Sequence, residues 1–261
     1  METANFPSGR KVFYFFPAGP YHKTIVKNII KKEIEIYTLS DIKRGLPLIF
    51  QYNGAVILFH IDEFKDFEHI KTIIRDFSRQ TSHRSIEIFL LTRAQEKYED
   101  IDEYMKEIGN CSPHLLDSSP ERASEELIDL LLNLNVRGQR NYVRFGTNNN
   151  SVASIEIMRK NRKIIGTVHD ISTAGVSFSL PEGPAFSIRT KLRDFAVDID
   201  GRIEGLAGTV TIKRKLPNGS LLYVLMFDKE VSQEISEQLH AVIHGSLQRQ
   251  FTERLNLVAV P

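Results

Sequence analysis

The sequence predicts two domains of different class: an α/β domain with a parallel sheet, then a domain of six antiparallel strands that ends in a helix. Two observations lead to this prediction. In residues 1–135, short apolar runs alternate with amphipathic helical stretches, whereas from residue 136 onward extended runs follow one another with turn residues between them. The length of 261 residues suits two domains of ordinary size.

The first half contains five strand–helix units. The run Lys11–Phe16 is β-branched and aromatic, and Tyr21–Glu33 places Ile25, Ile29 and Ile30 at helical spacing. The long helix from Pro120 follows a capping serine, Ser118 or Ser119. Nearly continuous apolar strands are typical of a parallel sheet covered on both faces. The other expected strands are Ile34–Leu39, Ala55–Ile61, Ser85–Thr92 and His114–Asp117, and the other expected helices are Asp41–Tyr52, Phe67–Gln80, Tyr98–Gly109 and Pro120–Asn135.

The second half contains short extended runs separated by turn residues such as Asp200-Gly201. Six strands in about 85 residues without a helix between them favour an antiparallel barrel or sandwich. The boundary is expected at Asn135–Gln139, which gives domains 1–135 and 136–261. The expected strands are Val152–Met158, Lys163–Asp170, Gly175–Leu180, Leu192–Ile199, Leu206–Lys215 and Leu221–Phe227, and an amphipathic helix follows at Ser232–Arg249.

Composition and charge narrow the classes of function. The formal net charge is +1, so we expect no nucleic-acid partner from overall charge. The single cysteine, Cys111, excludes an intramolecular disulfide and fits a reducing compartment. We find no signal peptide and no apolar run of about 18 residues, so we expect a soluble, cytoplasmic protein without membrane insertion.

Motifs of common enzymes are absent from the sequence. It has neither a phosphate-binding G-x-x-x-x-G-K-[ST] loop nor a G-x-S-x-G nucleophile turn, and the eight histidines are scattered without metal-ligand spacing. We therefore expect neither an enzyme nor a bound metal.

Two motifs in the second half carry the functional prediction. Arg140-Asn141-Tyr142-Val143-Arg144 is followed by Asp170-Ile171-Ser172-Thr173-Ala174-Gly175. In this order, ahead of six strands and a helix, they resemble the RxxxR and (D/N)xSxxG motifs of the PilZ domain, the bacterial cyclic di-GMP receptor module. The resemblance covers roughly Arg137 to Ser246, and it implies a six-stranded antiparallel β-barrel with a C-terminal helix.

The chemistry of these residue types suits that ligand, which offers two phosphodiesters and two guanines. The planar guanidinium groups of Arg140 and Arg144 can hydrogen-bond a phosphate or a guanine edge, and they can stack on a base. Asp170 can accept from a guanine N–H group, and Ser172 can bond a phosphate or a guanine edge. Gly175 permits a close approach of backbone.

Each residue also has a plainer interpretation. Arg137, Arg140 and Arg144 can be solvated linker residues, and Asp170 and Ser172 can cap a turn. Gly175 can serve only as a hinge with positive φ. The ordered combination favours the ligand site. Gln139 stands where many PilZ domains carry a second arginine, which the resemblance links to the number of ligand molecules bound. In this sequence, Gln139 favours the binding of one ligand molecule.

The first half resembles the response-regulator receiver, a flavodoxin-like fold, over roughly Arg10 to Asn135. Phosphate-accepting receivers need acidic residues after the first strand and a lysine after the fifth, but Phe16-Pro17-Ala18-Gly19 and Asp117-Ser118 occupy those places. Asp62 and Thr92 stand near the expected acceptor and hydroxyl positions. Without acidic metal ligands, phosphoryl transfer to Asp62 lacks charge neutralisation, so we expect a degenerate module that makes protein contacts.

The expected protein is thus a cyclic di-GMP receptor with a receiver-like N-terminal domain and an unidentified protein partner, active in motility, adhesion or transcriptional control. Ligand binding would order the linker Arg137–Arg144 on the barrel and change the arrangement of the domains. Two alternatives remain: a nucleotide-independent PilZ-like adaptor and a phosphoryl-accepting receiver. The basic cluster Arg159–Lys163 is expected to be a hairpin tip.

Overall fold

The computed structural model describes residues 9–52, 54–62, 67–81, 85–105, 111–147, 153–159, 161–180, 186–228 and 232–259. The chain divides into two compact units, one of Met1–Asn141 with Gln248–Pro261 and the other of Tyr142–Leu247. We call them the N-terminal unit and the barrel unit. The expected helix end at Gly109 and strand start at Val152 lie outside the described residues.

The N-terminal unit is built on a parallel sheet of five strands in the order β2-β1-β3-β4-β5. This order is that of flavodoxin-like folds. It confirms the α/β class predicted from the alternation of apolar runs and helices. The strands are β1 (Lys11–Phe15), β2 (Ile36–Leu39), β3 (Ala55–His60), β4 (Glu87–Thr92) and β5 (Cys111–Leu115).

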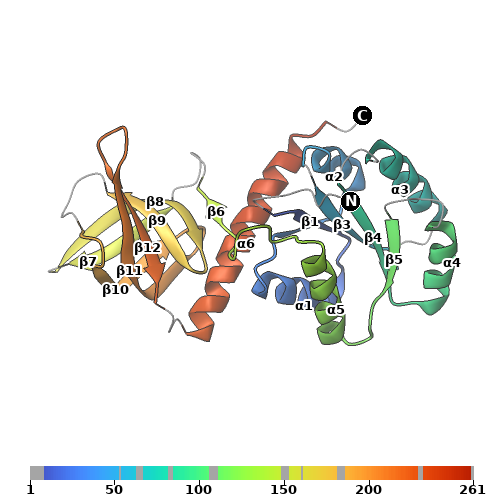
Figure 1. The fold of residues 1–261 in the computed structure, drawn as a ribbon, viewed down its shortest axis with the longest axis horizontal. Helices are drawn as coiled ribbons and strands as arrows, with labels where there is room; N and C mark the ends of the chain where they lie inside the picture. The colour runs from blue at the N-terminus through green and yellow to red at the C-terminus, as the bar shows by residue number, and fades with distance from the viewer. Residues whose placement is uncertain are drawn as a thin grey trace. The chain divides into compact units, whose positions relative to one another are not determined.

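The labelled helices cover both faces of this sheet, with α1 and α5 on one face and α2, α3 and α4 on the other (Figure 1). The core between the sheet and these two helices includes Val12 and Val56 from the strands, Ile25 from α1 and Leu127 from α5, all fully buried. The aromatic run of β1 is core, as its composition predicts, because Phe13, Tyr14 and Phe15 are inaccessible to solvent. The helices are α1 (Gly19–Lys31), α2 (Ile42–Ile49), α3 (Phe67–Thr81), α4 (Gln95–Met105) and α5 (Pro120–Asn133).

Side-chain caps fix the starts of two of these helices. Asp41 accepts a hydrogen bond from the backbone N–H of Arg44 at 3.0 Å, and Ser119 accepts one from that of Arg122 at 3.4 Å. Of the two serines proposed as the cap of α5, Ser119 is therefore the one used. The fifth strand begins three residues earlier than predicted, since Cys111 pairs with Ile88 of β4.

The barrel unit is a closed antiparallel barrel of six strands. The sheet runs β6-β8-β7-β10-β11-β12-β9, and pairing of β8 with β9 closes the ring, leaving β6 as a short strand beside β8. The structure thus selects a barrel over a sandwich and confirms the six-stranded prediction. The strands are β6 (Phe145–Gly146), β7 (Ser154–Arg159), β8 (Arg162–Ser172), β9 (Gly175–Leu180), β10 (Lys191–Asp198), β11 (Arg202–Lys215) and β12 (Leu221–Phe227).

The last helix, α6 (Gln233–Asn256), is longer than the predicted Ser232–Arg249 and contributes to both units. Leu239 and Ile243 belong to the barrel core. Beyond residue 247, Phe251 packs on β1 and β2, with its ring centroid 5.5 Å from that of Phe13 and 4.7 Å from that of Tyr37. None of the helices in the described ranges combines the length and apolar character needed to cross a membrane.

Candidate functional site

Asp170, Ser172 and Gly175 lie at the tight connection between β8 and β9. Ser172 pairs with Gly175 across the two-residue turn Thr173-Ala174. The Ser172 hydroxyl accepts from the Ala174 backbone N–H at 3.3 Å, and the Oδ2 atom of Asp170 accepts from the Ser177 hydroxyl at 2.6 Å. Both side chains thus form local hydrogen bonds at the turn, and these hydrogen bonds fix the positions of the side chains.

Gly175 is required by a close contact between strands rather than by its backbone angle. It is not among the described glycines with positive φ, so the hinge interpretation is wrong. A β-carbon at this position would lie 2.3 Å from the carbonyl oxygen of Leu225 on β12. Only glycine lets β9 and β12 approach in this way, as expected from its lack of a side chain.

Arg144 belongs to the same surface through the register of β6. Phe145 pairs with Ile171 and Gly146 with Asp170, so continuing this antiparallel register places Arg144 opposite Ser172. Phe145 is 1% exposed and belongs to the barrel core, whereas Arg144 before it is exposed. Because side chains alternate between the faces of a strand, Arg144 lies on the outer face.

The outer face beside this turn is lined by polar groups. Ser177 and Ser179 of β9 alternate with the core residues Val176 and Phe178, and the Ser179 hydroxyl lies 2.8 Å from Nε2 of His169. His169 is an extra residue on β8, because the register shifts between Val168 and Asp170. This β-bulge re-aims the side chains that precede the turn.

The structure therefore brings together four of the predicted residues: Arg144, Asp170, Ser172 and Gly175. The other three, Arg137, Gln139 and Arg140, belong to the N-terminal unit. Arg137 donates from Nη2 to the backbone oxygen of Lys32, while Gln139 and Arg140 are exposed. Their approach to the barrel remains a prediction.

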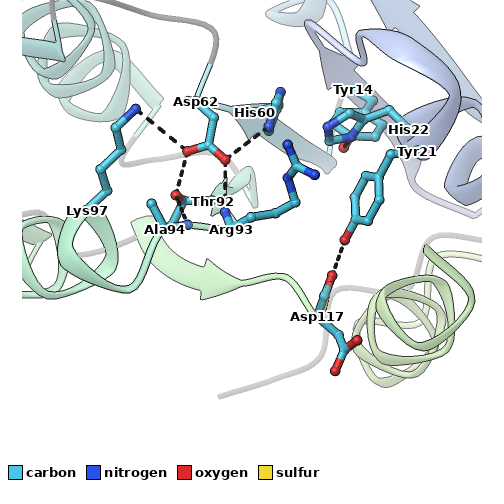
Figure 2. Close-up of polar contacts among 10 residues, drawn as sticks. All are labelled: Tyr14, Tyr21, His22, His60, Asp62, Thr92, Arg93, Ala94, Lys97 and Asp117. Atoms are coloured by element: carbon cyan, nitrogen blue, oxygen red, sulfur yellow. Dashed lines mark hydrogen bonds and ion pairs between the residues drawn. The ribbon is translucent and has the colours of Figure 1, made fainter. Parts of the chain in front are cut away.

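A second polar cluster lies at the carboxyl edge of the parallel sheet, centred on Asp62 (Figure 2). Its Oδ1 atom accepts from the Thr92 hydroxyl at 2.6 Å, and its Oδ2 atom accepts from the Arg93 backbone N–H at 2.9 Å. His60 lies 3.4 Å from Oδ2 and Lys97 lies 3.7 Å from Oδ1. Burial raises the pKa of Asp62, but the hydrogen bonds and the nearby positive charges outweigh it and lower the pKa below its ordinary value.

Two buried histidines meet beside Asp62. The sequence analysis did not predict this pair. The rings of His22 on α1 and His60 on β3 have centroids 3.9 Å apart, and each residue is at most 2% exposed. The Tyr14 hydroxyl bonds Nδ1 of His22. Burial, aided by His60 and Arg93, lowers the pKa of His22 to about 4. The positions of the two residues in the sequence could have indicated the pair, because His22 lies in the first turn of the helix after β1 and His60 ends the neighbouring strand β3.

Among the residues that the structure describes, this cluster lacks the carboxylate ligands with which a phosphoryl-accepting centre binds a magnesium ion. Both oxygens of Asp62 already have protein partners, and the loop after β1 supplies no carboxylate. Within the described residues, no group of three or more His, Cys, Asp or Glu side chains is placed to hold a metal ion. Magnesium-dependent phosphorylation would need such ligands.

No protein-family model matches the chain, and no curated protein is detectably similar to it. The solved structures that it resembles include the PilZ domain, with c-di-GMP, of YcgR from Escherichia coli, at 19% identity over 46% of this chain and 99% of that one, with a TM-score of 0.38. The motility inhibitor MotI from Bacillus subtilis matches at 20% identity, over 44% of this chain and 52% of that one, with a TM-score of 0.35. The MrkH–c-di-GMP complex from K. pneumonia matches at 18% identity, over 44% and 53% of the two chains, with a TM-score of 0.35. The matched region thus spans about half of the MotI and MrkH chains.

Proposed function

We propose that this chain is a receptor for cyclic di-GMP and binds it on the outer face of the barrel at the β8–β9 turn. The observation that carries the proposal is the register of β6, which places Arg144 opposite Ser172 and beside Asp170. A cation, a carboxylate and a hydroxyl then share one face. These are the groups needed to bind phosphates and guanine edges together.

Each residue has a distinct role in the proposal. The guanidinium of Arg144 binds a phosphate or stacks on a guanine. The Asp170 carboxylate is oriented by Ser177 through one oxygen, and it accepts a guanine N–H with the other. Gly175 keeps the floor of the site flat, because a side chain there would collide with β12. The ligand is bound and not converted.

The segment that precedes β6 completes the site in this proposal. Arg140 reaches the ligand from the chain between Arg137, which bonds Lys32, and Arg144 at the barrel. Arg137 and Gln139 contribute at the edge of the ligand. Ordering of this joint changes the arrangement of the two units, to the extent that the ligand binds one arrangement more tightly than another. The new arrangement then alters the binding of a protein partner that acts, for example, in motility, adhesion or transcription.

Calorimetric titration of the full chain with cyclic di-GMP tests the proposal. Arg144→Ala removes charged hydrogen bonds to an anionic ligand, so we expect a loss of about 2–4 kcal/mol, or roughly 30- to 1000-fold in affinity. Arg162→Ala is the matched control, because it removes the same charge from the opposite end of β8. Equal affinities of the wild-type and Arg144→Ala proteins would refute the assigned role. Absence of binding by the wild type would favour the adaptor alternative.

A further inference from the structure

A groove of about 340 Å³ lies at the end of the barrel where β7 and β8 form their hairpin. Its walls combine buried apolar side chains with exposed cations. Ile157, Phe186 and Leu192 are at most 7% exposed and line its interior. Among the described residues, the cations along it are Arg159, Lys191 and Arg193, all exposed.

Repulsion between like charges beside this groove lowers the stability of the fold. Arg159 pairs directly with Arg162 across the hairpin, and like charges in directly opposed positions repel. Glu156, on the same strand, is already engaged by Lys163 at 2.6 Å and Arg202 at 2.8 Å. Since the whole chain carries a formal charge of only +1, this concentration of cations is a local feature.

The backbone around the groove is strained. Arg189 has a φ of 72° and Asp194 a φ of 53°, in the left-handed region that side chains other than glycine seldom adopt. The pairing of β10 with β11 also shifts register between Leu192 and Phe195, so that Arg193 lies in a β-bulge. Bulges and strained residues concentrate where a protein directs side chains toward a ligand.

Exposed apolar side chains accompany the cations. Met158, which lines the groove, is 58% exposed, and Ile188 in the neighbouring turn is 55% exposed. The guanidinium carbon of Arg159 lies 5.5 Å from the ring centroid of Phe186, so the ring holds this arginine over the groove. Arginine, methionine and aromatic residues are the types enriched at protein interfaces.

The groove is separate from the β8–β9 turn. The ten residue steps from Arg162 to Ser172 run along a single strand, β8. At about 3.3 Å per step they span roughly 30 Å. A ligand at the turn therefore leaves this end of the barrel free.

We propose that the groove is a docking site for an acidic segment of a protein partner. An apolar side chain of that segment enters the groove beside Met158 and Leu192, and flanking carboxylates pair with Arg159, Lys191 and Arg193. A compact phosphate would leave the apolar interior without a partner, and a flat membrane surface does not fill a hollow of this volume. The docking site does not depend on the binding of cyclic di-GMP.

The test is a selection on the immobilised full chain, without cyclic di-GMP, from displayed peptides rich in Asp and Glu with interspersed apolar positions. Selected peptides are synthesised with a fluorescent label and titrated by anisotropy. We expect Arg159→Glu combined with Arg193→Glu to weaken binding by about 30-fold or more. Arg159→Glu turns a repulsive cross-strand pair into an attractive one, so the variant is expected to fold. Circular dichroism checks this, and Met158→Ser provides a second, uncharged variant that is expected to weaken binding.

Arg214→Glu is the matched control, because it reverses a charge on β11 outside the groove and should change affinity less than twofold. The proposal is overturned if no acidic peptide is enriched over neutral ones, or if the double variant binds the selected peptides as well as the wild type does. It is also overturned if inorganic phosphate or phosphatidylglycerol vesicles bind through Arg159 and Arg193 while the peptides do not. Arg144→Ala should leave peptide binding unchanged, which separates a failure here from a failure of the cyclic di-GMP site.

Discussion

The Asp62 carboxylate joins the loops that follow β3 and β4. Through Thr92 it holds the end of β4, and through the Arg93 N–H it holds the start of the next loop. The Thr92 hydroxyl in turn accepts from the backbone N–H of Ala94 at 3.0 Å. This chain of hydrogen bonds gives Asp62 a structural role at the carboxyl edge of the sheet.

His22 makes the stability of the N-terminal unit depend on pH. Its pKa of about 4 lies below the ordinary value of 6.5, so the unfolded chain binds more protons between these pH values. The contribution to stability is therefore complete above pH 6.5 and is lost as pH falls toward 4. Protonation would also leave a charged Nε2–H group that is buried without a hydrogen-bond partner among the described residues.

We predict that His22→Gln flattens the pH dependence of unfolding between pH 6.5 and 4. Glutamine can still accept from the Tyr14 hydroxyl, but it does not take up a proton. Urea unfolding of the full chain, followed by circular dichroism at a series of pH values, measures the effect. His169→Gln, in the barrel unit, is the control. Parallel pH profiles for wild type and His22→Gln would contradict the prediction.

Individual residues differ in how far the sequence alone determines their roles. Gly175 was predicted to permit a close approach of backbone, and in the structure a β-carbon at this position would lie 2.3 Å from the carbonyl oxygen of Leu225. The meeting of His22 and His60 was not predictable from spacing, because it requires β1 and β3 to be neighbours in the sheet. The sequence defines chemistry at each position, whereas strand order decides which positions meet.

At the scale of elements, long strands were predictable and the shortest was not. Extended runs bounded by turn residues, such as Asp200-Gly201, identify β7 to β12 in the sequence. Strand β6 has only two residues, too few to show any period, yet it is the strand that places Arg144. Its existence depends on pairing with β8, which is a tertiary effect.

The end of α6 shows a second limit of pattern reasoning. Leu239 and Ile243 form one apolar stripe in the barrel core, and Phe251 belongs to the core of the N-terminal unit. A helix that serves two cores does not keep one continuous stripe. The predicted helix therefore stopped at Arg249, where the first stripe ends.

We predict that Phe251→Ala destabilises the N-terminal unit by about 3–5 kcal/mol, the usual loss for a buried phenylalanine. Phe251 is 3% exposed and contacts Phe13 and Tyr37. Denaturant unfolding of the full chain measures the change. Leu257→Ala, at a residue 86% exposed, should change stability by less than about 0.5 kcal/mol. Similar unfolding curves for both variants would show that the helix end contributes little.

At the scale of the whole molecule, the proposed receptor function predicts ordering of the joint between the units. Hydrogen exchange of the amides in residues 138–144 should slow on addition of cyclic di-GMP, because the ligand would hold Arg140 and Arg144 together. Exchange measured by mass spectrometry on the full chain tests this. Arg144→Ala at the same ligand concentration should show no slowing. Unchanged exchange in wild-type protein saturated with ligand would exclude ordering of the joint.

The charge of the whole molecule conceals how unevenly it is distributed. The formal charge of +1 gave no reason to expect a nucleic-acid partner, yet Arg159, Lys191 and Arg193 line one groove. Residues from β7 and β10 meet there because these strands pair, with Ala196 opposite Glu156. Net charge describes solubility and long-range attraction, whereas recognition depends on the strand pairing that gathers charges in one place.

The side chain of Gln248 has one further consequence. Its amide oxygen accepts from the backbone N–H of Thr38 at 2.9 Å, and its amide nitrogen donates to the Thr38 carbonyl at 3.0 Å. Thr38 lies on β2, one of the two edge strands of the parallel sheet, and unpaired peptide groups at a sheet edge can pair with strands of other molecules. The Gln248 side chain thus occupies the main-chain N–H and carbonyl of Thr38, so that a strand added at this edge could not use them.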